Sequence, residues 1–152
     1  MKKRQLSKSD IKELNEQLKQ IYGLEEFLTK KDKVEVIEDL FVRVNEEPSF
    51  FYQDKEIIPT LKLILKNNFL KKITVDMGAV KFVASGADVM RPGIVRIEEG
   101  VNKDQIISII DEKNQKPLAV GRAMFNSEEM QKLSSGKVIK NLHWVGDKVW
   151  NS

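Results

Sequence analysis

The side chains that most often carry out catalysis or bind metal ions are scarce in this chain. Its 152 residues contain one histidine, His143, and no cysteine. Without thiols there is no disulfide, thiolate catalysis or cysteine-built zinc site, and a single imidazole excludes a two-histidine metal site. Carboxylates are plentiful, but none has the spacing of a known acid–base or metal motif, and no G-x-x-x-x-G-K-[ST] phosphate loop occurs. We therefore expect no enzyme, no metal site and no cofactor.

Two residues with catalytic potential are better explained by structure. His143 lies between Leu142 and Trp144 in a strand-like segment with no evident paired acid. Nucleophilic catalysis needs such a base beside a serine or threonine. We expect His143 to be packed or hydrogen-bonded, and we expect Asp88 to cap a short helix.

Composition indicates an ordinary globular protein. Hydrophobic residues make up 41% and charged residues 32% of the chain, and 26 basic residues against 23 acidic ones give a net charge of +3. This balance is compatible with a polyanionic partner without proving one. No stretch approaches the roughly 18 apolar residues of a membrane span, and the basic start lacks the apolar segment of a signal peptide. We expect a cytoplasmic protein with no membrane partner.

The elements that position these residues differ between the two halves. Seven of the eight glycines lie from Gly78 onward, so the second half is expected to be a small barrel of short strands joined by tight turns. The first half predicts a helix capped by Ser7 and stopped at Gly23, with one more helical turn over 24–28. A hairpin over 34–44 and a second helix opening at Pro59 follow. The fold class is therefore α+β.

The second half contains one ambiguous segment. Asn102 and Gln105 are spaced to cap a helix over 106–110, but the isoleucines there favour a strand. We predict a strand that forms a hairpin with 117–120. A short helix capped by Asn126 and stopped at Gly136 follows. The chain then has strand-like segments over 137–139 and 143–150, split by a turn at Gly146–Asp147.

One stretch is specific enough to suggest a family. Residues 75–94 (VDMGAVKFVASGADVMRPGI) resemble the opening of a PUA domain, the RNA-binding module named from pseudouridine synthases and archaeosine transglycosylases. Residues 117–123 (PLAVGRA) and 141–150 (NLHWVGDKVW) are similar to its later strands. Residues 50–53 (FFYQ) and 58–63 (IPTLKL) resemble the pre-PUA region of the malignant-T-cell-amplified-sequence (MCT) and ligatin proteins.

The resemblance covers nearly the whole chain and has definite implications. It implies a pre-PUA α+β domain over 1–72 and a PUA pseudo-β-barrel over 73–152. It also implies a non-enzymatic RNA-binding protein acting in initiation or recycling, with tRNA or rRNA, the small ribosomal subunit and a density-regulated-type protein as partners. The absence of cysteine and the abundance of lysine and glutamate suit an archaeal member.

The same resemblance implies an RNA groove made by the loop at Ser85–Gly86, a short helix over 87–91 and a neighbouring strand. Glycine lets backbone N–H groups approach a phosphate, and basic side chains supply charge. The implied RNA-binding residues are Lys81, Ser85, Gly86, Ala87, Asp88, Met90, Arg91 and Arg122. The alternative for each glycine is a simple turn, and for each lysine (81, 137 and 140) a solvated strand face.

Two other functions compete with this one. The first is a module that brings RNA to a tRNA- or rRNA-modifying enzyme. The second is a protein–protein adaptor with little RNA affinity, using the surface around 50–52. We expect those aromatic residues to form an interface between the two halves, and Trp144 and Trp150 to lie in the barrel core.

Overall fold

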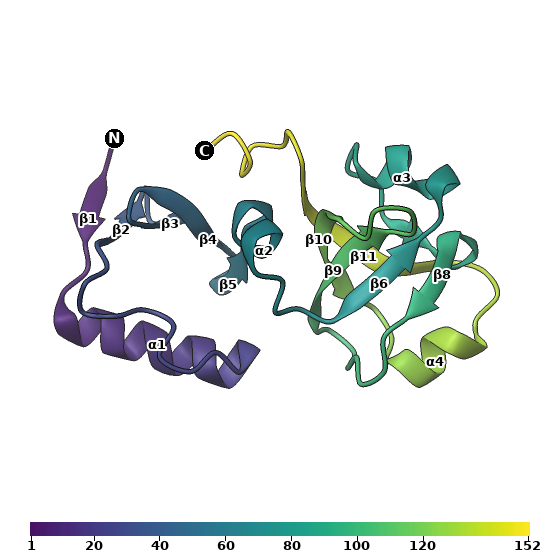
Figure 1. The fold of residues 1–152 in the computed structure, drawn as a ribbon, viewed down its shortest axis with the longest axis horizontal. Helices are drawn as coiled ribbons and strands as arrows, with labels where there is room; N and C mark the ends of the chain where they lie inside the picture. Colours follow the sequence, from purple (N-terminus) through teal and green to yellow (C-terminus); the bar gives the residue numbers. More distant parts are fainter. The chain divides into compact units, whose positions relative to one another are not determined.

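The computed structural model describes all residues, 1–152, and separates them into two compact units, Met1–Pro59 and Thr60–Ser152 (Figure 1). The first unit combines one helix with a sheet and the second combines three α-helices with a sheet, which confirms the predicted α+β class. None of the helices combines the length and the apolar character needed to span a membrane.

The first helix of the first unit has the predicted ends. Helix α1 (Lys8–Tyr22) begins with a capping box, in which the Asp10 N–H donates to Ser7 Oγ at 3.2 Å and the Ser7 N–H donates to the Asp10 carboxylate at 3.0 Å. It ends at Gly23 with φ +69°, a left-handed conformation that glycine adopts without a Cβ penalty. Leu14 and Leu18 are buried. The helical turn predicted over 24–28 is absent, because Leu28 instead exchanges two hydrogen bonds with the side chain of Asn15.

The sheet of the first unit is an antiparallel meander. Its strands, in the order β1-β2-β3-β4-β5, are β1 (Lys3–Gln5), β2 (Val34–Ile37), β3 (Phe41–Val44), β4 (Glu47–Gln53) and β5 (Glu56–Pro59). The predicted hairpin is confirmed as β2–β3. Residues 38–40 connect the two strands, and the Leu40 N–H donates to the Ile37 carbonyl. The residues between them, Glu38 and Asp39, have φ of +54° and +56°, the signs of the central residues of a type I′ turn.

The aromatic residues of β4 belong largely to the core. Phe50 and Phe51 are buried, and the Phe50 ring packs edge-on against Phe27 with centroids 5.6 Å apart. The hydroxyl of Tyr22 at the end of α1 donates to the Ile57 carbonyl in β5 at 2.6 Å. Burial of the two phenylalanines removes most of the surface that the adaptor hypothesis assigned to residues 50–52.

The second predicted helix begins later than expected. Pro59 is the last residue of β5, and Thr60 caps helix α2 (Leu61–Lys66) by accepting from the Leu63 N–H at 3.1 Å. The expectation that Pro59 opens the helix is therefore wrong. Helix α2 packs on β10 of the second unit, so the compact units divide before it. The sequence-domain boundary at residue 72 stays a prediction.

The second unit is built on a six-stranded mixed sheet. Its strands are β6 (Lys72–Val75), β7 (Val89–Met90), β8 (Ile94–Ile97), β9 (Ile106–Asp111), β10 (Pro117–Ala123) and β11 (Lys137–Trp144), in the order β7-β11-β10-β9-β6-β8. The edge strands β7 and β8 are joined by one 3₁₀ turn, η1 (Arg91–Gly93). Because three residues bridge its two edges, the sheet must curl almost closed. This confirms the predicted pseudo-barrel.

Most strand predictions for this unit are correct. The isoleucine-rich segment is strand β9, paired antiparallel with β10 as predicted and parallel with β6. Helix α4 (Ser127–Lys132) has the predicted capping box of Asn126 and Glu129, but it ends at Leu133, before Gly136. The last strand is one continuous element, β11, that stops at Trp144. The predicted break after residue 139 and the predicted strand beyond residue 144 are wrong, whereas the predicted turn at Gly146–Asp147 is present. There the carboxylate of Asp147 accepts from the Trp144 and Trp150 N–H groups and turns the chain.

Candidate nucleic-acid interface

The predicted site is built around a helix that lies before the glycine loop. Helix α3 (Met77–Val83) follows β6 and is capped by Asp76, whose Oδ1 accepts from the Ala79 N–H at 2.9 Å. The helix predicted over 87–91 does not exist, because β7 and η1 occupy that stretch and β7 pairs with β11. The glycine loop therefore follows a helix C-terminus, where backbone carbonyls and not N–H groups are left over.

The loop closes tightly onto the last strand. The N–H groups of Ser85 and Ala87 both donate to the Phe82 carbonyl, and Ser85 Oγ donates to the Lys81 carbonyl at 2.7 Å. Gly86 has φ +101°, and a Cβ at this position would lie 2.7 Å from a ring carbon of Trp144. Gly86 is thus required both by its backbone conformation and by the close approach of an indole ring.

A buried amide and a carboxylate hold the loop in place. The Asn141 side chain donates from Nδ2 to the carbonyls of Val83 and Ala87, both at 3.0 Å. Asp88 accepts from the Asn141 backbone N–H at 2.7 Å and pairs with Lys137 Nζ at 2.9 Å. Burial opposes ionisation of Asp88, but these two partners and the charge of Lys140 outweigh it and lower its pKa. Asp88 is therefore an anchor to β11 and not the helix cap that the sequence predicted.

Several side chains around this loop face solvent. The Phe82 ring is 59% exposed, and the Met90 side chain 50%. The Lys81 ammonium lies 5.5 Å from the centroid of the Phe82 ring. An exposed aromatic ring beside a cation is suited to stacking a nucleobase and contacting its phosphate. Phe82 was not among the residues predicted from the sequence, because its apolar neighbours in 79–84 (AVKFVA) suggest a core position.

Arg91 is engaged within the fold. Its Nε donates to the Met130 carbonyl at 2.8 Å and its Nη1 to the Ile94 carbonyl at 3.3 Å. The Met130 carbonyl lies in α4 and the Ile94 carbonyl begins β8. The side chain therefore ties three elements together beside the closure of the barrel.

Replacing Arg91 with alanine is expected to lower the free energy of unfolding by about 1–2 kcal/mol, because two carbonyls lose a charged donor. The matched control is Arg96→Ala on β8, an exposed arginine, which should change stability by less than about 0.5 kcal/mol. Urea unfolding followed by tryptophan fluorescence measures both. Unchanged stability together with weakened RNA binding would assign Arg91 to RNA contact.

Three further basic residues lie on the strands β10 and β11. Arg122 on β10 is the cross-strand partner of Lys140 on β11, and Lys137 lies on the same strand as Lys140. Arg122 also donates from Nη1 to the Asp104 carbonyl at 2.9 Å. Of the predicted set, Lys81 and the residues within 85–90 lie along α3, its loop and β7. The other two, Arg91 and Arg122, donate hydrogen bonds to backbone carbonyls of the protein.

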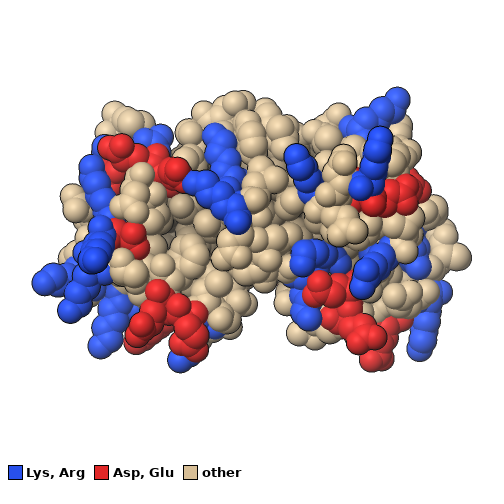
Figure 2. Space-filling model, viewed as in Figure 1, with Lys and Arg blue, Asp and Glu red and all other residues tan.

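The two units differ in charge. The unit Thr60–Ser152 has 15 basic and 10 acidic residues, a net charge of +5, whereas Met1–Pro59 has 11 and 13, a net charge of −2. On the face shown in Figure 2, both basic and acidic side chains are exposed. The net positive charge of the second unit therefore attracts a polyanion, and we expect this attraction to be modest and to weaken with salt.

His143 has the structural role that the sequence predicted. The side chain is fully buried, its Nε2 accepts from the Leu61 N–H at 3.0 Å, and its Nδ1 lies 2.8 Å from the Asp147 carboxylate. Nδ1 therefore carries the proton and donates to Asp147. Burial lowers the pKa of His143 more than the Asp147 carboxylate raises it.

Two family models match the chain. The model described as PUA domain matches residues 71–145, and the model described as a domain of unknown function, DUF1947, matches residues 2–67. The two matches together cover most of the chain, in the order that the pre-PUA and PUA resemblance implied.

Curated proteins related to this chain include one from an archaeon and two from eukaryotes. An uncharacterized protein of Methanocaldococcus jannaschii is 44% identical over 151 residues, covering 96% of this chain and 93% of that protein. Translation machinery-associated protein 20 of Saccharomyces cerevisiae is 35% identical over 139 residues (84% and 77%). Malignant T-cell-amplified sequence 1 of Rattus norvegicus is 36% identical over 161 residues (97% and 88%).

Solved structures share this fold. A hypothetical protein from Pyrococcus horikoshii superposes with a TM-score of 0.84 at 34% identity, over 99% of this chain and 98% of that chain. A chain of the archaeal box H/ACA sRNP Nop10–Cbf5 complex superposes with a TM-score of 0.51 at 31% identity, over 63% of this chain and 30% of that chain.

Proposed function

Because this chain belongs to the family of PUA-domain proteins that includes malignant T-cell-amplified sequence 1 and translation machinery-associated protein 20, we propose that it binds RNA in translation and catalyses no reaction. Its RNA is tRNA or the rRNA of the small ribosomal subunit, its step is initiation or recycling, and its place is the cytoplasm. A density-regulated-type protein is its proposed partner. The names of the relatives support the translation role.

One observation carries the RNA-binding proposal. The exposed Phe82 ring and the Lys81 ammonium lie together on α3, beside a glycine loop that Asn141 fixes to β11. A fixed platform binds RNA without the entropic cost of ordering a mobile loop. We propose that Phe82 stacks on an unpaired base and that Lys81 contacts the adjoining phosphate. We also propose that the bound RNA strand is flanked by residues 85–90 and by Lys137, Lys140 and Arg122.

Fluorescence anisotropy with labelled tRNA, intact and with its 3′ single-stranded end removed, tests this proposal. Phe82→Ala is expected to weaken binding about tenfold through the lost stacking. Lys81→Ala is expected to reduce the slope of log K against log salt by about 0.7, the contribution of one phosphate contact to a single strand.

Two matched variants control this experiment. Val95→Ala removes an exposed apolar side chain from β8, and Lys113→Ala removes an exposed lysine from the turn between β9 and β10. Neither should change affinity by more than about twofold. Equal loss of binding in the controls, or tRNA affinity no greater than that of a random duplex, would overturn the proposed platform.

The likeness to a chain of the box H/ACA complex favours a second candidate, a module that brings RNA to a modifying enzyme. This candidate predicts a stable enzyme partner and no association with ribosomes. Co-sedimentation with small ribosomal subunits distinguishes the two functions. Binding to subunits that is lost in Phe82→Ala supports the translation role, and a modifying enzyme recovered in place of subunits supports the second candidate.

A further inference from the structure

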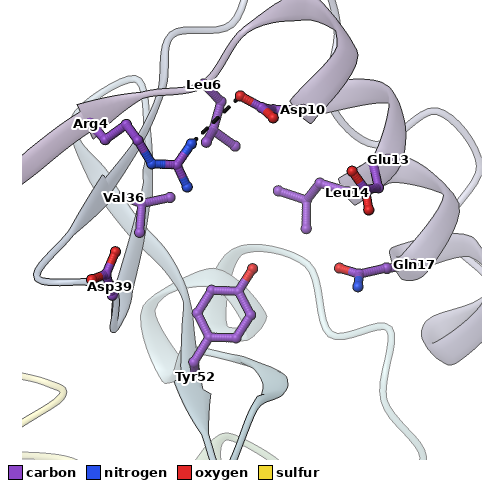
Figure 3. A pocket seen from close by; sticks show the side chains of 9 residues that line it. All are labelled: Arg4, Leu6, Asp10, Glu13, Leu14, Gln17, Val36, Asp39 and Tyr52. Carbon is purple, nitrogen blue, oxygen red and sulfur yellow. Dashed lines mark ion pairs between the residues drawn. The ribbon is translucent and has the colours of Figure 1, made fainter.

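The first unit contains a cavity that the RNA-binding proposal does not use. Its volume is about 270 Å³, and it lies between α1 and the strands β1, β2 and β4. Leu6, Leu14 and Val36 line its apolar part. Polar side chains line the remainder: Arg4, Asp10, Glu13, Gln17, Asp39 and Tyr52. Figure 3 shows the Tyr52 hydroxyl pointing into the space between Arg4 and Leu14.

Part of this polar lining is already neutralised within the protein. Arg4 Nη1 lies 3.6 Å from the Asp10 carboxylate, and Lys2 Nζ lies 2.7 Å from that of Asp39. The backbone N–H of Ser7 also donates to Asp10 and, with the Ser7 side chain, holds the pKa of that carboxyl below its usual value. Both acids are therefore ionised and balanced by a cation at neutral pH.

Three other polar groups have no such partner. The Glu13 carboxylate, the Gln17 amide and the Tyr52 hydroxyl make no hydrogen bond or ion pair within the protein, although all three line the cavity. Glu13 and Gln17 are four residues apart on α1, so both project toward the same side of the helix. Burial raises the pKa of Tyr52, which keeps its hydroxyl protonated and neutral near pH 7. The open mouth of the cavity thus presents the solvent-exposed Glu13 carboxylate and Gln17 amide, and its wall presents the hydroxyl of the half-buried Tyr52. Glu13 is the carboxylate of the lining without a cation partner in the protein.

We propose that this cavity binds the side chain of an arginine presented by a protein partner. The alkyl stem lies on Leu6, Leu14 and Val36, where long cationic side chains bury their methylene groups. The guanidinium, with five N–H donors in a planar fork, donates to the Glu13 carboxylate, the Gln17 amide oxygen and the Tyr52 hydroxyl oxygen. The volume suits one long side chain and falls below that of typical drug-sized sites.

Charge complementarity selects a basic partner. The lining carries three carboxylates against one guanidinium, and the first unit has a net charge of −2. An RNA phosphate near these carboxylates is repelled, whereas an arginine is attracted. The RNA-binding proposal concerns residues 81–90 and neighbouring strands of the other unit, so the two proposals stand or fall separately.

Two-dimensional ¹H–¹⁵N NMR on the full chain tests this inference, with acetyl-Gly-Arg-Gly-amide as the probe. Saturable shifts are expected at residues 10–17 and at Val36 and Tyr52. The same tripeptide with citrulline, a neutral isostere of arginine, is expected to bind at least tenfold more weakly. A uridine oligonucleotide should leave these signals unchanged.

Variants assign the acceptors. Glu13→Gln is expected to weaken binding of the arginine tripeptide about tenfold because the only uncompensated charge is lost, and Tyr52→Phe about threefold because one acceptor is lost. Glu16→Gln is the matched control, since Glu16 lies on α1 and does not line this cavity. Its affinity should be unchanged.

Three results would overturn the proposal. Equal binding of the citrulline and arginine tripeptides would remove the role of charge. Shifts outside the cavity, or equal losses in Glu13→Gln and Glu16→Gln, would show general attraction to an acidic surface. Shifts at Tyr52 with the oligonucleotide alone would make the cavity an RNA site.

Discussion

Replacing Gly86 with alanine lowers the free energy of unfolding by about 2–4 kcal/mol and removes binding to tRNA. Both effects are expected from the same geometry. At φ +101° an alanine is strained, and its Cβ would lie 2.7 and 2.8 Å from two ring carbons of Trp144. The indole packs against the barrel core, so it has little room to retreat. Displacing the loop also shifts α3, which carries Phe82. Urea unfolding and tRNA anisotropy measure the two effects.

The variant Gly136→Ala separates the cost of a positive φ from the cost of a steric clash with a neighbouring side chain. Gly136 also has a positive φ, +90°, but a Cβ at this position would have no neighbouring atom within 4 Å. This variant should lose only about 1 kcal/mol, the cost of the backbone conformation. The double variant Gly86→Ala/Trp144→Leu should recover part of the stability lost by Gly86→Ala. Equal losses in Gly86→Ala and Gly136→Ala would contradict the importance of the indole contact.

The second large effect is expected at His143. His143→Ala should cost about 3–5 kcal/mol, because it opens a cavity, leaves the Leu61 N–H without its acceptor and deprives the Asp147 carboxylate of its imidazole donor. Thermal unfolding followed by circular dichroism measures this loss. Lys113→Ala serves again as a surface control.

The imidazole also sets a pH dependence with a definite sign. Its pKa is lowered in the folded protein, so below about pH 6.5 the unfolded chain binds a proton that the folded protein resists. The contribution of the neutral imidazole to the free energy of unfolding should be fully present above pH 6.5. It should fall as the pH decreases toward the pKa of His143 in the folded protein, by at most about 1.4 kcal/mol per pH unit. His143 is the only histidine.

The pH profile of His143→Ala provides the comparison. In this variant the loss of stability that begins as the pH falls below about 6.5 should be absent. The carboxylates whose pKa values are lowered, such as Asp10 and Asp88, reduce stability at more acidic pH, below their ordinary value of 3.8. An unchanged slope in the variant would show that another group titrates in this range.

Local signals in the sequence predicted local structure well. The capping boxes at Ser7 and Asn126 and the left-handed Gly23 depend on contacts within a few residues, and the structure has all three. One error was local, since Thr60 and not Pro59 caps the second helix through the Leu63 N–H three residues on. Others come from longer-range effects. Asp76 and not Asp88 caps a helix, because the Asp88 carboxylate accepts a hydrogen bond from the backbone N–H of Asn141, 53 residues later in the sequence.

The site itself stays a prediction, and the sequence indicated a segment of chain and not the contacts within it. The family resemblance indicated residues 81–91, and the structure shows these residues along α3, its loop, β7 and the start of η1. Nothing local in the sequence distinguishes the exposed Phe82 from a core phenylalanine. The role of Asn141 was equally hidden, since its acceptors are carbonyls 54 and 58 residues away. Arg91 was chosen for its charge, whereas its position relative to the Met130 carbonyl depends on the closed barrel.

The position of β11 has a consequence for synthesis of the protein on the ribosome. This strand, the last in the sequence, lies inside the sheet, between β7 and β10, and supplies Asn141 and Trp144 to the loop. The first unit is a meander of strands that pair almost entirely with their neighbours in sequence, so it can fold while translation continues. The barrel cannot close until residues 137–144 have left the exit tunnel. The RNA platform therefore forms only once that strand has emerged, and a shorter nascent chain cannot bind RNA through it.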